Sequence, residues 1–135
     1  MRRHAMPISV LLADDTAIMR RAVRSILDSR SELVVVGEAT DFAATMHLIE
    51  TLRPNVVVMD LHMPGEFKIS PADVKSQLRK ATSRLLAISI WDDDDSRALA
   101  DSFGAAALLN KIDLSATLVP AIIDLYRPKV LAAAS

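Results

Sequence analysis

Five short runs of apolar residues, most of them rich in β-branched side chains, recur along the chain at residues 8–13, 33–37, 55–59, 85–90 and 105–109. Each run spans about five or six residues, which is the usual length of a β-strand. The apolar residues within a run are continuous and do not alternate with polar ones, a pattern typical of a parallel sheet covered on both faces. The pattern therefore predicts five buried parallel strands.

The segments between these runs predict helices. Apolar residues recur there at steps of three and four, the period of an amphipathic helix, at residues 18–27, 42–52, 74–78, 99–103 and 118–125. Ser70-Pro71 is a typical helix start, Gly104 is placed as a stop, and Pro54 and Pro128 end two of the segments. Pro120 lies inside the last segment, where a proline costs about 3 kcal/mol, so this helix is expected either to start late or to kink.

Strict alternation of strands and helices predicts an α/β fold with right-handed crossovers. Of the two common doubly wound sheets, five strands fit the flavodoxin-like order 2-1-3-4-5 better than the six-stranded dinucleotide fold. We therefore expect a (βα)5 domain with a five-stranded parallel sheet over residues 7–126, with terminal tails at residues 1–6 and 127–135.

Composition excludes several classes of function. A chain of 135 residues has room for one domain, and the absence of cysteine excludes disulfides, thiolate metal sites and a cysteine nucleophile. The net charge of -1 provides neither a basic footprint for nucleic acid nor a polybasic membrane patch. No stretch approaches the roughly 20 apolar residues of a membrane span, so we expect a cytoplasmic protein that does not bind membranes.

The chemistry is expected where the strands end, because ligands of open α/β sheets bind outside the carboxyl ends of the strands. The polar groups there are Asp14 and Asp15 after the first run, Gly37 and Glu38 after the second, Asp60 at the third, Ser89 at the fourth and Lys111 after the fifth. The first and third strands are neighbours in the predicted order. Three carboxylates, a hydroxyl and an ammonium group should therefore meet at one edge.

This set of groups suits phosphoryl transfer. Ionised carboxylates need a cation to lie close together, and oxygen ligands suit Mg²⁺. A carboxylate can act as a nucleophile toward phosphorus, while an ammonium group and a hydroxyl share the charge on the phosphoryl oxygens. The absence of thiolates favours this chemistry over zinc hydrolysis.

These residues carry a family resemblance. Asp14-Asp15 after the first strand, Asp60 in the segment Met59-Asp60-Leu61-His62-Met63-Pro64-Gly65, Ser89 and Lys111 together resemble a bacterial response-regulator receiver domain, the phosphoacceptor half of two-component signalling. The resemblance covers roughly residues 7–126, and residues 8–65 most resemble receivers that precede helix-turn-helix DNA-binding domains.

The resemblance implies a role for each residue. Asp60 would accept a phosphoryl group from a histidine kinase or a phosphotransfer protein. Mg²⁺, with Mn²⁺ as a substitute, would be bound by Asp15 and Asp60, by Asp14 through water and by the backbone carbonyl of His62. Lys111 would contact the phosphoryl group, and Ser89 would swing toward it.

The resemblance also implies that the surface between Asp92 and Tyr126 contacts a protein partner, and the sequence does not identify that partner. It further implies that phosphorylation can lead to a homodimer. With no DNA-binding domain after residue 126, we expect a stand-alone receiver without direct nucleic acid binding. Two positions depart from the family pattern. Leu108 stands where an aromatic residue is usual, and Ile90 stands where a small residue is usual, so that Ile90 is hypothesised to shield the phosphoryl group from water.

Simpler interpretations remain open for individual residues. Asp14-Asp15 is also a suitable cap for the first helix, and the acidic run at residues 92–95 fits a helix cap better than a second metal site. Arg20, Arg21 and Arg24 are interpreted as a solvated helix face, with an acidic partner as the alternative.

Three other functions compete with the receiver. The first is a phosphatase with an aspartate nucleophile, disfavoured because His62 stands where that class needs a second aspartate. The second is a receiver-like interaction module that works without phosphate. The third is the receiver part of a longer DNA-binding transcription regulator.

Overall fold

The computed structural model describes residues 7–126, and its strands and helices alternate along the chain. The strands are β1 (Ile8–Ala13), β2 (Leu33–Ala39), β3 (Val56–Asp60), β4 (Arg84–Ser89) and β5 (Ala107–Asn110). The helices are α1 (Ala17–Asp28), α2 (Phe42–Leu52), α3 (Pro71–Ala81), α4 (Asp94–Ser102) and α5 (Leu114–Tyr126). Short 3-10 turns, η1 (Glu66–Lys68) and η2 (Lys111–Asp113), precede α3 and α5. The terminal tails expected at residues 1–6 and 127–135, and the stop expected at Pro128, lie outside the described residues.

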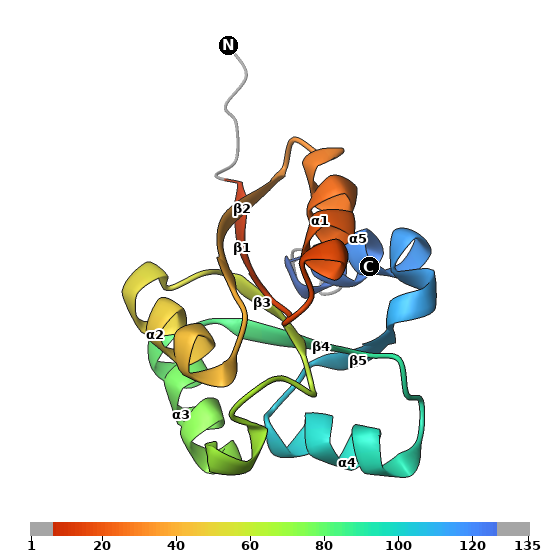
Figure 1. Ribbon diagram of the computed structural model, residues 1–135. Coiled ribbons are helices and arrows are strands. Elements are labelled where there is room, and N and C mark those ends of the chain that lie inside the picture. Colours follow the sequence, from red (N-terminus) through yellow and green to blue (C-terminus); the bar gives the residue numbers. More distant parts are fainter. Residues whose placement is uncertain (1–6, 127–135) are drawn as a thin grey trace, which may run out of the picture.

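The five strands form one parallel sheet in the order β2-β1-β3-β4-β5, which confirms the predicted flavodoxin-like topology. Helices α1 and α5 cover one face of this sheet, and α2, α3 and α4 cover the other (Figure 1). Central strand β3 is buried along its whole length, because helices pack on both of its faces and strands on both of its edges. The carboxyl ends of β1, β3, β4 and β5 are thereby held at one edge.

Two apolar clusters hold the layers together. One lies between the sheet and α2, α3 and α4, and contains Phe42 and Phe103 with their ring centroids 5.9 Å apart. The other lies between the sheet and α1 and α5. Burial of several large apolar side chains in each cluster, at about 1.5–3 kcal/mol apiece, accounts for most of the force that holds the helices against the sheet.

Two strand boundaries differ from the prediction by two residues, and the others agree to within one residue. Strand β2 continues to Ala39, so Gly37 and Glu38 lie within the strand rather than after it. The register between β2 and β1 shifts after Val35, so that Leu11 pairs with Gly37 and β2 has one extra residue at this point. With this extra residue, β2 extends beyond its most apolar part. Strand β5 begins at Ala107, because residues 105–106 belong to the loop that leaves α4.

Helix α5 begins at Leu114, so of the two alternatives that Pro120 left open, a late start or a kink, the late start is wrong. Pro120 lies inside the helix, where it removes one backbone donor at a cost of about 3 kcal/mol. The residues around it, Leu118, Val119 and Ile122, are buried against the sheet. Their burial is large enough to offset the proline, which is a tertiary effect that local propensity does not contain.

Side-chain caps set the helix starts. Ser70 caps α3 directly before Pro71, as predicted, and Asp93 caps α4 through the backbone amide of Ser96. The acidic run at residues 92–95 is therefore a cap. Thr16 caps α1, so the interpretation of Asp14-Asp15 as the cap is wrong, and both carboxylates are available for another role. Within residues 7–126, no helix is both long and apolar enough to cross a lipid bilayer.

Candidate functional site

Three carboxylates meet where β1 and β3 end. Asp14 and Asp15 directly follow β1, and Asp60 is the last residue of β3. Because β1 and β3 are hydrogen-bonded neighbours, one carboxylate oxygen from each residue lies within 4.8 Å of the other two. Asp14 and Asp60 are buried, and Asp15 is exposed. The site therefore combines two desolvated carboxylates with one that faces solvent.

Lys111 supplies the positive charge for the two buried carboxylates. It follows β5, at the same edge of the sheet, and its Nζ lies 2.7 Å from Asp14 Oδ2 and 3.0 Å from Asp60 Oδ2. The Lys111 side chain is itself largely buried, at 11% exposure. One ammonium group thus joins the ends of β1 and β3 from across the sheet.

Asp14 is held at each of its polar groups. Its backbone amide donates to the Ala39 carbonyl at 3.0 Å. Its Oδ1 accepts from the Thr16 amide at 2.9 Å and from the Thr16 hydroxyl at 3.0 Å. Its Oδ2 is buried and makes no hydrogen bond of good geometry, although the Lys111 ammonium lies close to it. This oxygen retains lone pairs for a further ligand.

Burial and charge act in opposite directions on the central pair. Desolvation raises the pKa of Asp60 above its ordinary value, and the hydrogen bond from the His62 amide and the contact with Lys111 only partly counteract it. Burial alone would lower the pKa of Lys111, but its close contacts with the Asp14 and Asp60 carboxylates and their negative charges raise that pKa overall. Lys111 therefore stays charged at neutral pH, and Asp60 is a more basic carboxylate than an exposed aspartate.

The donor set fits a divalent cation such as Mg²⁺. Its ligand atoms are all oxygens and they converge within 4.8 Å, and the buried Asp14 Oδ2 is paired only with the Lys111 ammonium among the described residues. Hard oxygen donors with one solvent-facing carboxylate suit an ion that keeps several of its waters. Asp14, Asp15 and Asp60 are the residues that would hold it.

The remaining predicted site residues, Ser89 and His62, lie at or just after the ends of the paired strands β4 and β3, but they differ in their contacts. Ser89 ends β4 and is buried, and its hydroxyl accepts from the Trp91 amide at 2.9 Å; among the described residues it makes no hydrogen bond to Asp60. The His62 amide donates to Asp60 Oδ1 at 3.0 Å, while the His62 ring faces Glu66 at 3.1 Å. The structure thus places the His62 backbone, and not its ring, against Asp60.

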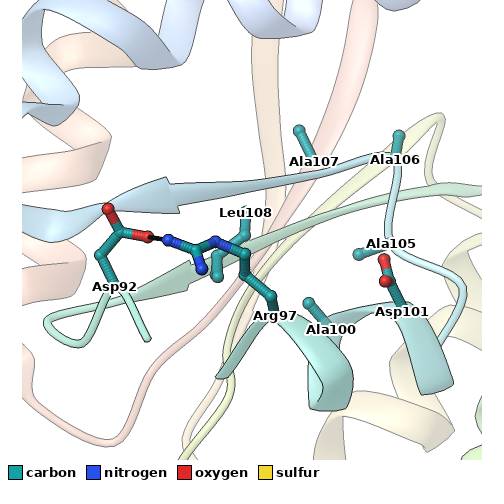
Figure 2. Close-up of a pocket in the computed structure, with 8 residues that line it drawn as sticks. All are labelled: Asp92, Arg97, Ala100, Asp101, Ala105, Ala106, Ala107 and Leu108. Atoms are coloured by element: carbon teal, nitrogen blue, oxygen red, sulfur yellow. Dashed lines mark hydrogen bonds and ion pairs between the residues drawn. The ribbon is translucent and has the colours of Figure 1, made fainter. Parts of the chain in front are cut away.

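The two departures from the family pattern differ in burial. Ile90 is 55% exposed, whereas Leu108 is partly buried and packs against the cluster that contains Phe42 and Phe103. Leu108 lines a cavity of about 260 Å³ between α4 and β5, together with Ala100 and Ala105–107. Figure 2 shows Arg97 extending from α4 toward Asp92 beside this cavity. The Arg97 guanidinium and the Asp92 carboxylate lie 2.8 Å apart.

Sequence reasoning missed the role of Arg20. The sequence pattern predicts that Arg20 lies on a solvated face with Arg21 and Arg24, but the Arg20 side chain is only 18% exposed. Its guanidinium donates to the Asp14 carbonyl at 2.8 Å and to Glu38 at 3.0 Å. The topology held a signal for this contact, because the first turn of α1 and the carboxyl end of β2 lie at the same edge of the sheet.

Comparison with known proteins agrees with this geometry. Residues 10–122 match the response regulator receiver domain family. The chain therefore belongs to the response regulator receiver domain family. It is 29% identical over 105 residues to the nitrate/nitrite response regulator protein NarL of Escherichia coli (strain K12), covering 78% of this chain and 48% of that protein.

One further curated relative and one solved structure are similar to this chain. A protein-glutamate methylesterase/protein-glutamine glutaminase of Myxococcus xanthus is 32% identical over 111 residues, which cover 82% of this chain and 32% of that protein. The chain thus spans about half or less of the length of these curated relatives. The solved signal receiver domain of the response regulator NarL from Mycobacterium tuberculosis superposes with a TM-score of 0.78 at 32% identity, covering 90% of this chain and 97% of that domain.

Proposed function

We propose that this chain is a phosphoacceptor receiver, with residues 7–126 as the receiver domain, that takes a phosphoryl group onto Asp60 from a histidine kinase or a phosphotransfer protein. The observation that carries the proposal is the position of the Lys111 ammonium, 2.7 Å from Asp14 and 3.0 Å from the buried carboxylate of Asp60. A receiver domain is a signalling module, so the proposed outcome is a change in the protein's own surface rather than turnover of a substrate.

The groups at the strand ends support this chemistry. A carboxylate oxygen of Asp60 would form a bond to phosphorus while the bond from phosphorus to the donor's imidazole nitrogen breaks, and the donor leaves as neutral histidine after it gains a proton. Lys111 is placed to meet the phosphoryl oxygens, since its ammonium already contacts the Asp60 carboxylate. Water would later cleave the acyl phosphate, which releases inorganic phosphate and regenerates the Asp60 carboxylate.

Asp15, Asp60 and the His62 carbonyl would bind Mg²⁺ or Mn²⁺, with Asp14 acting through water. When bound, the cation would neutralise charge on the phosphoryl oxygens. Asp14 and Lys111 keep the buried end of the site in place whether or not the cation is present, because both are held by contacts within the protein.

Ser89 would carry the response. Its hydroxyl is engaged with the Trp91 amide, at the start of the loop that leads into α4. A move of this hydroxyl toward a phosphoryl group on Asp60 would release that amide and free the loop. We propose that the surface between Asp92 and Tyr126 then contacts a protein target in the cytoplasm, either directly or as a phosphorylated homodimer.

The test is phosphorylation by acetyl phosphate, followed by intact mass, with and without Mg²⁺. The wild-type protein should gain one phosphoryl group only when Mg²⁺ is present, and Asp60→Asn should gain none. Asp28→Asn removes an exposed carboxylate on α1 and should behave as the wild type.

Two results would contradict the proposal. A phosphoryl group on the Asp60→Asn variant would place the acceptor elsewhere. No gain in a folded wild-type protein under either metal condition would favour an interaction module that works without phosphate.

A further inference from the structure

Arg20 joins three segments at the edge of the site. It lies in the first turn and a half of α1, and its guanidinium donates to the Asp14 carbonyl at the end of β1 and to Glu38 near the end of β2. The Arg20 side chain is 18% exposed and that of Glu38 is 33% exposed. Both are therefore shielded enough for the contact to hold a defined geometry.

The Asp14 carbonyl belongs to the peptide unit that joins Asp14 to Asp15. A peptide unit is planar, so fixing its oxygen also fixes the direction of the Asp15 amide and α-carbon. Asp15 needs such a constraint, because its exposed carboxylate makes no hydrogen bond or ion pair with any residue between 7 and 126. Asp14, by contrast, is held by Thr16 and Lys111 at its side chain.

We infer that Arg20 is a positioning residue for the cation site: by holding the Asp14 carbonyl it aims the Asp15 carboxylate at Asp14 and Asp60. The inference rests on the proposed function, since it assumes that these carboxylates bind Mg²⁺. It assigns to Glu38 the supporting role of holding the guanidinium from the other side.

A positioning role and a purely electrostatic role of Arg20 predict opposite changes in Mg²⁺ affinity when Arg20 is replaced. Arg20 is a cation near three carboxylates, so an effect of its charge alone would weaken Mg²⁺ binding, and its removal would tighten binding by up to about threefold after screening. A positioning role predicts that removal weakens binding. Loss of a residue that orients metal ligands typically costs about tenfold or more in affinity.

Arg24 is a matched control. It lies one turn further along α1 and forms an ion pair with the same Glu38 carboxylate, but it makes no contact with Asp14 among the described residues. Replacing Arg24 removes the same charge from nearby without releasing the carbonyl.

The experiment is calorimetric titration of Mg²⁺ into the unphosphorylated full chain, with urea unfolding of each variant in metal-free buffer. Arg20→Met should bind Mg²⁺ about tenfold more weakly, and Arg24→Met should bind as the wild type or up to about threefold more tightly. Arg20→Lys keeps the charge, but an ammonium group cannot donate to both acceptors with the geometry of the planar guanidinium. This variant should therefore bind Mg²⁺ about threefold more weakly than the wild type. It also serves as the test if Arg20→Met fails to fold.

The outcomes separate the two proposals. Unchanged or tighter Mg²⁺ binding by Arg20→Met, or wild-type binding by Arg20→Lys, would overturn the positioning role of Arg20 and leave the proposed function intact. A lower stability with unchanged affinity would make Arg20 a structural residue only. A wild-type protein that binds no Mg²⁺ would overturn both the inference and the metal-dependent function.

Discussion

The carboxyl ends of β1 and β3 and the surface between α4 and β5 belong to the same sheet, yet they are built differently. At the strand ends, Lys111 and the buried carboxylates of Asp14 and Asp60 fill the space with paired charges. Between α4 and β5, Leu108 and several alanines leave a cavity of about 260 Å³ (Figure 2). The first region retains every residue that the receiver family resemblance requires, and the second lacks the usual aromatic residue.

The difference indicates that the two parts of the proposed function, the chemistry at Asp60 and the response surface, depend on exact geometry to different degrees. Chemistry at Asp60 needs charges within about 3 Å of each other, so its residues leave little room for substitution. A response surface needs only a change that a partner detects, and loosely packed elements change at low free-energy cost. A receiver can therefore keep the acceptor site while the route to its response surface changes.

The largest effect is expected for Lys111→Met. This change leaves two buried carboxylates without their cation, and breaking such a pair costs about 3 kcal/mol or more in free energy of unfolding. Urea unfolding in metal-free buffer measures the loss, and added Mg²⁺ should recover part of it. Lys75→Met, on the exposed face of α3, should stay within about 0.5 kcal/mol of the wild type. Equal losses in the two variants would show that the site does not depend on Lys111 for its stability.

The contrast in packing predicts opposite tolerance to a larger side chain. Leu85 is 1% exposed in β4, and Leu85→Phe should cost about 1–3 kcal/mol through overpacking. Leu108→Phe has the adjoining cavity to expand into and should cost less than about 0.5 kcal/mol. Chemical denaturation of both variants tests this pair, and a similar loss in each would mean that the cavity beside Leu108 is not available to its side chain.

A smaller effect, and one of opposite sign, is expected for Asp60→Asn in the absence of metal: a gain in stability. Burial raises the folded-state pKa of Asp60 above its ordinary value of 3.8, so the folded protein holds that proton more tightly than the unfolded chain. The stability contributed by protonated Asp60 is present at low pH and lost as the pH rises above 3.8 through the folded-state pKa. Neutral asparagine avoids this loss and should raise the unfolding midpoint at pH 7 by about 3 °C.

Thermal unfolding at several pH values checks the sign. The advantage of Asp60→Asn should be largest near neutral pH and shrink as the pH falls toward 4 or so. Asp28→Asn, an exposed substitution, should show no such trend. A lower midpoint for Asp60→Asn at neutral pH would mean that its contact with Lys111 outweighs the cost of burying its charge.

The smallest effect is expected for Ile90→Ala. Its side chain is 55% exposed beside Ser89, so any shielding of a phosphoryl group from water is partial. Ile90→Ala should shorten the lifetime of the phosphorylated protein by about threefold, which corresponds to less than 1 kcal/mol in the barrier. Intact mass followed over time after removal of the donor measures the decay. An unchanged lifetime would refute the shielding role of Ile90.

Most of the fold was predictable because its signals are local or periodic. Continuous apolar runs located the strands, and the alternation with helices, together with their number, led to the order 2-1-3-4-5. Boundaries were less predictable. Helix α5 begins before Pro120 because apolar residues on both sides of the proline are buried against the sheet, which no local propensity records.

The sequence by itself determined which polar groups lie at the strand ends, because an aspartate after an apolar strand is visible in the chain and parallel strands end at one edge. Only the tertiary structure decided how those groups are paired. Lys111 reaches Asp14 and Asp60 across the sheet, and Arg20 turns back from α1 to the Asp14 carbonyl instead of facing solvent. Such contacts depend on side-chain direction and on the desolvation of each charge, and both are set by the packing of distant segments.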